Sequence, residues 1–125
     1  MDIESGHVEV AQRTFTEADV RTFAEVSRDR GDHHLERDDE GRLLVHGLLT
    51  ATLATEIGGR FTVLARRMSY QFRRPVYAGE TVRCETEFTT VAERSDGRTE
   101  VAAEATFTRE RDGAVVVTGS FDGVV

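Results

Sequence analysis

The sequence contains no lysine and no tryptophan, and it has one cysteine and one proline in 125 residues. The single Cys84 excludes an intramolecular disulfide, and its position inside an expected strand predicts a simple packing role. All 16 basic residues are arginine, and they are outnumbered by 23 acidic residues, so the net charge is −7. Nucleic-acid binding is therefore not expected, because neutralising phosphates requires a basic face.

Long apolar runs are also absent. No run approaches the roughly 20 residues that cross a bilayer, and residues 1–5 are acidic where a signal peptide is basic and then apolar. We therefore expect a cytoplasmic protein without membrane contact. Hydrophobic residues make up 38% and charged residues 31%, which is typical of a globular chain, and the length predicts one domain spanning residues 1–125.

A short helix is predicted near the N-terminus. Residues 16–19, Thr-Glu-Ala-Asp, have the pattern of a capping box, in which the threonine hydroxyl accepts from the aspartate N–H. Val20 and Phe23 follow at helical spacing and should face the core before the helix ends near Arg28. The polar segment 28–41 is predicted to be an exposed loop.

The most apolar stretch, residues 47–57, is predicted to be a helix that is buried on most sides. Gly58 and Gly59 follow it, and they are expected to end the helix as a left-handed cap.

Five strands are predicted from their β-branched and aromatic residues: 7–13, 61–73, 80–91, 98–109 and 114–121. The last four are expected to form a meander, with hairpin signals at residues 95–97 and 112–113. Within the second strand Met68, Tyr70 and Phe72 alternate with polar residues, as in a half-buried strand.

This order of elements predicts an α+β fold. A five-stranded antiparallel sheet wrapped around one buried central helix is the hotdog fold. Five strands in one sheet leave an open edge and a partly covered helix, so we expect two copies to pair edge to edge as a homodimer.

Polar residues suited to proton transfer precede the buried helix. Asp29 and His34 lie five positions apart in the polar loop, and a carboxylate and an imidazole held so can share a water and move its proton. The N–H of Gly47, at the helix start, can bind developing negative charge. Together they suggest water chemistry beside a polarised carbonyl. Taken alone, the pair also fits an exposed loop, and the glycine also fits a place of close packing.

Four segments resemble the MaoC-like family of (R)-specific enoyl-CoA hydratases, in the family's order and over most of the chain: residues 23–29, 34–36, 45–51 and 72–82. By this resemblance Asp29 and His34 are the catalytic pair and Gly47 supplies the oxyanion N–H. The implied reaction is reversible hydration of a short 2-enoyl thioester to the (R)-3-hydroxyacyl thioester. Coenzyme A is then part of the substrate, and no separate cofactor is implied.

The loop departs from the family pattern Asp-x-Asn-Pro-x-His. Gly31 stands at the Asn position, where it is expected to preserve a left-handed turn, and Asp32 stands at the Pro position. The segment between His34 and His46 is also shorter than usual. Asp32 and His33 are therefore alternative candidates for the catalytic pair.

Further residues are candidates for substrate contact. His46 is expected to position its neighbours, while Thr52 and Thr55 are expected to line the pocket or to bond back to their own helix. A group of arginines is expected to bind the phosphates of coenzyme A, or else to form a solvated strand face: Arg66, Arg67, Arg73 and Arg74.

A metal site is not expected. The adjacent His33 and His34 converge poorly on one ion, and neither Asp29 nor Asp32 brings a third well-spaced ligand. The main rival activity is that of a hotdog acyl-CoA thioesterase, which typically relies on a carboxylate on the central helix. Only Glu56 fits that description, and it lies at the far end. A non-catalytic hotdog subunit that binds an acyl thioester is the second rival.

Overall fold

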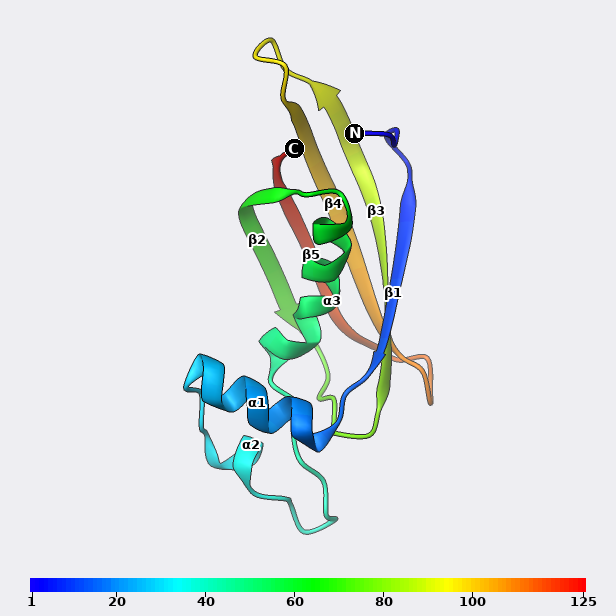
Figure 1. Ribbon diagram of the computed structural model, residues 1–125. Coiled ribbons are helices and arrows are strands. Elements are labelled where there is room, and N and C mark those ends of the chain that lie inside the picture. Colours follow the sequence, from blue (N-terminus) through cyan, green and yellow to red (C-terminus); the bar gives the residue numbers. More distant parts are fainter.

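The computed structural model describes all 125 residues (Figure 1). The elements run in the order β1 (Val8–Thr14), α1 (Glu17–Ser27), α2 (Asp32–Leu35), α3 (Gly47–Arg60), β2 (Leu64–Phe72), β3 (Thr81–Glu93), β4 (Thr99–Arg109) and β5 (Val115–Val124). The five strands form one antiparallel sheet, and α3 lies along one face of it. The predicted α+β hotdog arrangement is confirmed.

The core lies between α3 and the sheet. Leu53 and Ile57 of α3 are buried in one cluster with Phe88 and Phe107, which project from β3 and β4. Burial of such large apolar side chains contributes about 1.5–3 kcal/mol each. Leu48 is an exception to the predicted all-round burial, since it is 61% exposed at the N-terminal end of the helix. No helix of the protein is long and apolar enough to cross a membrane.

The capping box at the start of α1 is confirmed. The Thr16 hydroxyl accepts from the Asp19 N–H at 3.0 Å, and the Asp19 carboxylate accepts from the Thr16 N–H at 3.0 Å. Val20 is buried as predicted, and the helix ends at Ser27, followed by Arg28, which adopts φ 61°. Of the catalytic candidates, Asp29 follows directly after this helix, whereas His34 lies on α2 and Gly47 begins α3.

The expected four-strand meander is wrong for β2. The strand order is β1-β3-β4-β5-β2, so β2 pairs with β5 and β1 pairs with β3. Because α3 crosses the sheet between β1 and β2, these two strands lie at opposite edges (Figure 1). The segment 73–80 then returns the chain to the side of β1.

The predicted glycine cap of α3 is also wrong. The helix continues through Gly58 and Gly59 to Arg60, and neither glycine has a positive φ. Thr62 instead adopts the left-handed conformation, with φ 57°, and the Gly58 carbonyl accepts from the N–H groups of Phe61 and Val63. Because Gly58 is buried, packing holds the last turn in place.

The segment 28–41 is not wholly a loop. It contains the one-turn helix α2, whose first residue, Asp32, suits the positive end of the helix dipole. Four residues are too few to show a helical periodicity, so the sequence pattern does not predict this turn. Its effect is to bury His34 while the rest of the segment stays near solvent.

The inward face of β2 is more exposed than a half-buried strand requires. Tyr70 is largely covered, whereas Met68 is 43% and Phe72 52% exposed. Because β2 is an edge strand, its inward residues lie at the margin of the surface that α3 covers.

Candidate active site

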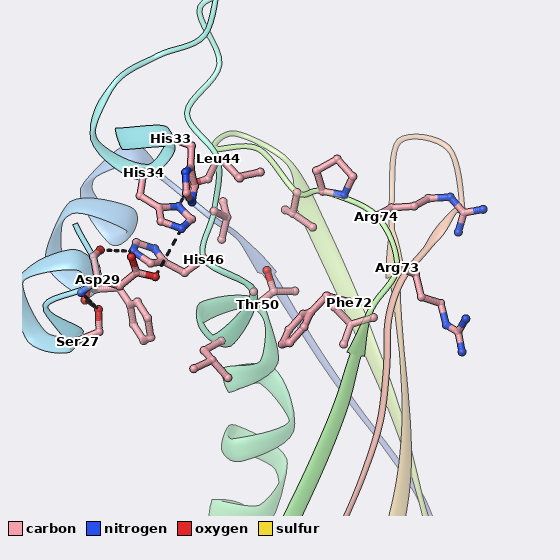
Figure 2. A pocket seen from close by; sticks show the side chains of 17 residues that line it. Ser27, Asp29, His33, His34, Leu44, His46, Thr50, Phe72, Arg73 and Arg74 are labelled. Atoms are coloured by element: carbon pink, nitrogen blue, oxygen red, sulfur yellow. Dashed lines mark hydrogen bonds and ion pairs between the residues drawn. The ribbon is translucent and has the colours of Figure 1, made fainter. Parts of the chain in front are cut away.

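A cavity of about 660 Å³ opens at the N-terminal end of α3 (Figure 2). Its wall includes the end of α1, the loop that follows, the segment 44–46, the first turn of α3 and the segment 72–76. Asp29, His34 and Gly47 therefore line one cavity, although they come from three parts of the chain.

Local hydrogen bonds orient the Asp29 carboxylate. The Ser27 hydroxyl donates to the Phe23 carbonyl at 2.6 Å and accepts from the Asp29 N–H at 3.0 Å. Asp29 Oδ1 accepts from the Gly31 N–H at 3.2 Å, as in an Asx turn. The other oxygen, Oδ2, lies 3.7 Å from Nε2 of His34.

The contact between His34 and Leu44 selects one tautomer of the imidazole. Nδ1 lies 2.8 Å from the Leu44 carbonyl, which can only accept, so Nδ1 carries the proton and Nε2 carries the lone pair. The separation of 3.7 Å from Asp29 Oδ2 is too long for a hydrogen bond, but a water can donate to both atoms. Burial lowers the pKa of His34, and the neighbouring His46 and His33 lower it further. The neutral imidazole is thereby favoured.

His46 braces this pair. Its ring stacks on that of His34 with centroids 3.7 Å apart and an interplanar angle of 14°. Its Nε2 donates to the backbone carbonyl of Asp29 at 3.0 Å (Figure 2). The contacts fit the expected positioning role, because one buried ring holds both the loop that carries Asp29 and the face of His34. Its Nδ1 is buried without a partner.

The altered loop keeps Asp29 and His34 together without the left-handed turn expected at Gly31. Gly31 has φ −55°, which any residue can adopt. A Cβ atom there would lie 3.0 Å from the ring of His33 and 3.5 Å from Asp29 Oδ1, so glycine provides space. Of the two alternative candidates, His33 lines the cavity, exposed and packed against His34, whereas Asp32 does not line it.

Gly47 combines an unpaired donor with close packing. No carbonyl or side chain of the protein accepts from its N–H, which stands at the positive end of α3. A Cβ atom on Gly47 would approach the ring of Phe72 to 2.7 Å. Glycine therefore lets the aromatic ring close one side of the cavity directly over the helix start.

Two predicted pocket residues lie elsewhere. Thr52 donates back to the Leu49 carbonyl at 2.5 Å, and Thr55 is exposed further along α3, so neither lines the cavity. Thr50 lines it instead, and it was not predicted, because helical spacing alone does not tell which threonine faces a ligand.

The four arginines do not form one cluster. Arg73 and Arg74 line the cavity and pair with no carboxylate, since they bond to Gln71, Thr118 and the Val115 carbonyl. Arg66, at the other end of β2, is held by carboxylates of β4 and β5 at 3.1 Å. Residues seven apart on an extended chain, as Arg66 and Arg73 are, are separated by roughly 23 Å. Only the pair at the cavity is placed to meet an anionic ligand.

A third possible metal ligand was not foreseen from the sequence. Asp29, His34 and His46 offer ligand atoms within 4.8 Å of one another. The two rings, however, are stacked almost parallel, so the lone pairs in their planes run side by side and cannot converge on one ion. The arrangement suits a brace for proton transfer better than a metal centre.

Comparisons with known proteins show the family and the fold of the chain. The family model of the FAS1-like dehydratase domain region matches residues 6–119. A 3-hydroxybutyryl-CoA dehydratase of Methylorubrum extorquens is 32% identical over 96 residues, which cover 69% of this chain and 60% of that protein. The chain thus spans less than two thirds of that relative's length.

Solved structures of other proteins share the fold of this chain. An (R)-hydratase from A. caviae involved in PHA biosynthesis superposes with a TM-score of 0.82 at 28% identity, covering 97% of this chain and 96% of that one. A MaoC-like dehydratase from Rhodospirillum rubrum, at 20% identity, shares the fold with a TM-score of 0.75 over 99% and 93% of the two chains. The chain belongs to the FAS1-like, MaoC-like dehydratase family of hotdog proteins.

Proposed function

We propose that the protein hydrates a short-chain 2-enoyl-CoA reversibly to the (R)-3-hydroxyacyl-CoA. The observation that supports this most is the facing pair of acceptors, Asp29 Oδ2 and His34 Nε2, beside an unpaired N–H at the start of α3. We infer the short acyl group from the related 3-hydroxybutyryl-CoA dehydratase, and the (R) configuration from the related (R)-hydratase.

The proposed reaction begins with a water between Asp29 and His34. As the pair takes one proton, the remaining hydroxide adds to C3 of the enoyl thioester. Electrons move to the thioester oxygen, where the Gly47 N–H and the helix dipole stabilise the negative charge. The enolate then collapses and C2 receives the proton held by the pair, so that water supplies both added groups. Dehydration is the reverse.

Arg73 and Arg74 are proposed to bind the phosphates of coenzyme A. Guanidinium groups form strong, charge-assisted hydrogen bonds with phosphate oxygens. Both side chains are exposed at the cavity, and neither is neutralised by a carboxylate. The thioester would then lie between this basic rim and the Asp29–His34 pair.

The thioesterase alternative finds no support at Glu56. Its carboxylate bonds to Arg60 at 2.8 Å near the C-terminal end of α3, and it does not line the cavity. A carboxylate so placed cannot reach a thioester that lies at the opposite end of the helix.

We further propose that two copies form a homodimer through β2. This strand is an open edge of the sheet, and three of its apolar side chains are well exposed: Leu64, Met68 and Phe72. Pairing the edges of two copies would satisfy the backbone and cover these side chains. Sedimentation of the purified protein should give twice the chain mass of 13.9 kDa, whereas a monomer at micromolar concentration would contradict the dimer.

Incubation of the pure protein with crotonyl-CoA tests the proposed activity. Loss of the enone absorbance without release of thiol is the expected result. Release of free thiol would indicate a thioesterase, and binding without either change would indicate an acyl-thioester-binding subunit. Chiral analysis of the 3-hydroxybutyryl product then tests the configuration.

A further inference from the structure

An almost fully buried threonine lies next to the proposed oxyanion site. Thr50 is 1% exposed and lines the cavity, and no hydrogen bond within the protein involves its hydroxyl. In Figure 2 its side chain lies at the N-terminal end of α3, between those of His46 and Phe72. A hydroxyl at the cavity wall that makes no bond within the protein is placed to bond with something that enters the cavity.

Thr52, two residues further on, shows the usual alternative. A threonine inside a helix commonly donates to a carbonyl three or four residues earlier, and Thr52 does so to Leu49. Thr50 does not make the equivalent bond to His46, although its own backbone N–H bonds to that carbonyl at 3.1 Å. The hydroxyl of Thr50 is therefore available to a ligand, while that of Thr52 is not.

The helix geometry directs the side chain of Thr50 toward Gly47. Residues three apart lie on one face of a helix at a separation of about 5–6 Å. The Cα–Cβ bond tilts toward the helix N-terminus, so the side chain of Thr50 leans toward the end of α3 where the Gly47 N–H is unpaired. One acceptor atom in front of the helix can thus meet both donors.

We propose that the Thr50 hydroxyl is the second donor to the thioester oxygen, completing with the Gly47 N–H a two-donor oxyanion hole. The proposal rests on the hydration reaction proposed above. As the enolate forms, negative charge grows on this oxygen, and a second fixed donor stabilises the transition state more than the ground state. Thr50 would accordingly act on kcat more than on KM.

The alternative position for Thr50 is beside the apolar acyl tail. An acyl chain would displace water from the hydroxyl without replacing its hydrogen bond, which disfavours binding. Removing the hydroxyl would then tighten binding and lower KM. Loss of the hydroxyl therefore lowers kcat/KM if Thr50 is a donor to the thioester oxygen, and raises kcat/KM if Thr50 lies beside the acyl tail.

Thr50→Val, which preserves the shape of the side chain, is the primary test. With crotonyl-CoA we expect kcat to fall by about tenfold to a hundredfold and KM to change by less than about threefold. Thr50→Ser should retain most of the wild-type kcat, because it keeps the donor. Thr52→Val is the matched control and should leave kcat unchanged. A kcat for Thr50→Val within twofold of wild type, or a lower KM alone, would overturn the proposal.

A spectroscopic test separates this inference from the hydration activity itself. Butyryl-CoA labelled with ¹³C at the thioester carbonyl cannot be hydrated, but two donors should lower its carbonyl stretching frequency when it is bound. The shift should shrink in Thr50→Val and persist in Thr52→Val. If that pattern appears in a protein that does not hydrate crotonyl-CoA, the activity is wrong and the two-donor site stands. An unshifted band in wild type, or equal shifts in both variants, would overturn the site.

Discussion

The two ends of α3 differ in how their polar groups are satisfied. At the C-terminal end Arg60 bonds to Glu56 at 2.8 Å, to Glu9 at 3.1 Å and to the Val10 carbonyl at 2.9 Å. At the N-terminal end the Gly47 N–H and the Thr50 hydroxyl have no partner in the protein, and both face a cavity. From this contrast we expect a ligand to complete the N-terminal end of the helix, while the protein itself completes the C-terminal end.

The two ends of β2 repeat this contrast. Arg66 is neutralised by Glu100 and Asp122, whereas Arg73 and Arg74 pair with no carboxylate. The unneutralised arginines lie at the same end of the molecule as the unpaired donors of α3. A substrate with an anionic head and a polarisable carbonyl matches both sets of groups.

The largest expected effect comes from removing the proton-transfer pair. Asp29→Asn or His34→Ala should lower kcat for crotonyl-CoA hydration by roughly 10²–10⁴-fold, because general acid–base catalysis supplies about that factor. Enone absorbance would give the rates and circular dichroism would verify folding. Folded variants that hydrate at the wild-type rate would remove both residues from the mechanism.

Gly47→Ala should cost about tenfold to a hundredfold in kcat. The added Cβ atom would lie 2.7 Å from the ring of Phe72, so either the ring or the helix start must move, and misplacing a reacting group by about 1 Å has such an effect. Phe72→Leu in the same background should recover part of the loss. If the double variant were no faster than Gly47→Ala, the steric explanation would be wrong.

The pH dependence should reflect the neutral form of His34. Burial lowers its pKa from the ordinary 6.5, with His46 and His33 acting in the same direction, while the hydrogen bond to the Leu44 carbonyl and the charge of Asp29 oppose them. Activity that needs the Nε2 lone pair is therefore expected to persist below pH 6.5 and to fall only as the pH drops through the lowered value.

Folding stability should also decrease as the pH falls. The unfolded state binds the proton at higher pH, so the contribution of His34 is fully present above pH 6.5 and is lost as the pH falls through the folded pKa. Denaturant titrations and kcat profiles would measure both effects. His33→Asn should move the acidic limb of kcat to higher pH. A limb above pH 6.5 in wild type would contradict a buried neutral imidazole.

Smaller effects are expected at the ends of β2. Arg73→Gln with Arg74→Gln should raise KM for crotonyl-CoA by about three- to tenfold with little change in kcat, because the phosphates lie far from the reacting carbons. Arg66→Gln with Arg67→Gln serves as the control with an equal loss of charge, because neither of these arginines lines the cavity. Similar KM values in the two variants would mean that net charge, and not this rim, is what matters.

The smallest effect is expected at the C-terminal end of α3. Glu56→Gln should leave kcat within about twofold of wild type and change the free energy of unfolding by less than about 1 kcal/mol, as for an exposed ion pair. A large fall in the kcat of thioester hydrolysis would instead favour the thioesterase.

The sequence predicted what depends on local pattern. Alternation and turn residues predicted the five strands, and the capping box predicted the start of α1 at the correct residue. The resemblance brought Asp29, His34 and Gly47 together, and the structure places all three on one cavity. Their catalytic roles remain predictions.

Long-range packing explains the features that the sequence did not predict. The pairing of β2 with β5 depends on how α3 crosses the sheet, which no local signal encodes. The continuation of α3 through Gly58 depends on burial of its last turn, and Thr62 takes the left-handed position that glycine usually occupies. The orientation of the Thr50 hydroxyl depends on a cavity formed by distant segments.

The most direct measurement is a crystal structure with (R)-3-hydroxybutyryl-CoA bound. We expect the 3-hydroxyl oxygen to lie between Asp29 Oδ2 and His34 Nε2, and the thioester oxygen to lie about 3 Å from the Gly47 nitrogen. A thioester bound away from the N-terminal end of α3, or a hydroxyl that contacts Asp32 or His33 instead, would contradict the proposed site.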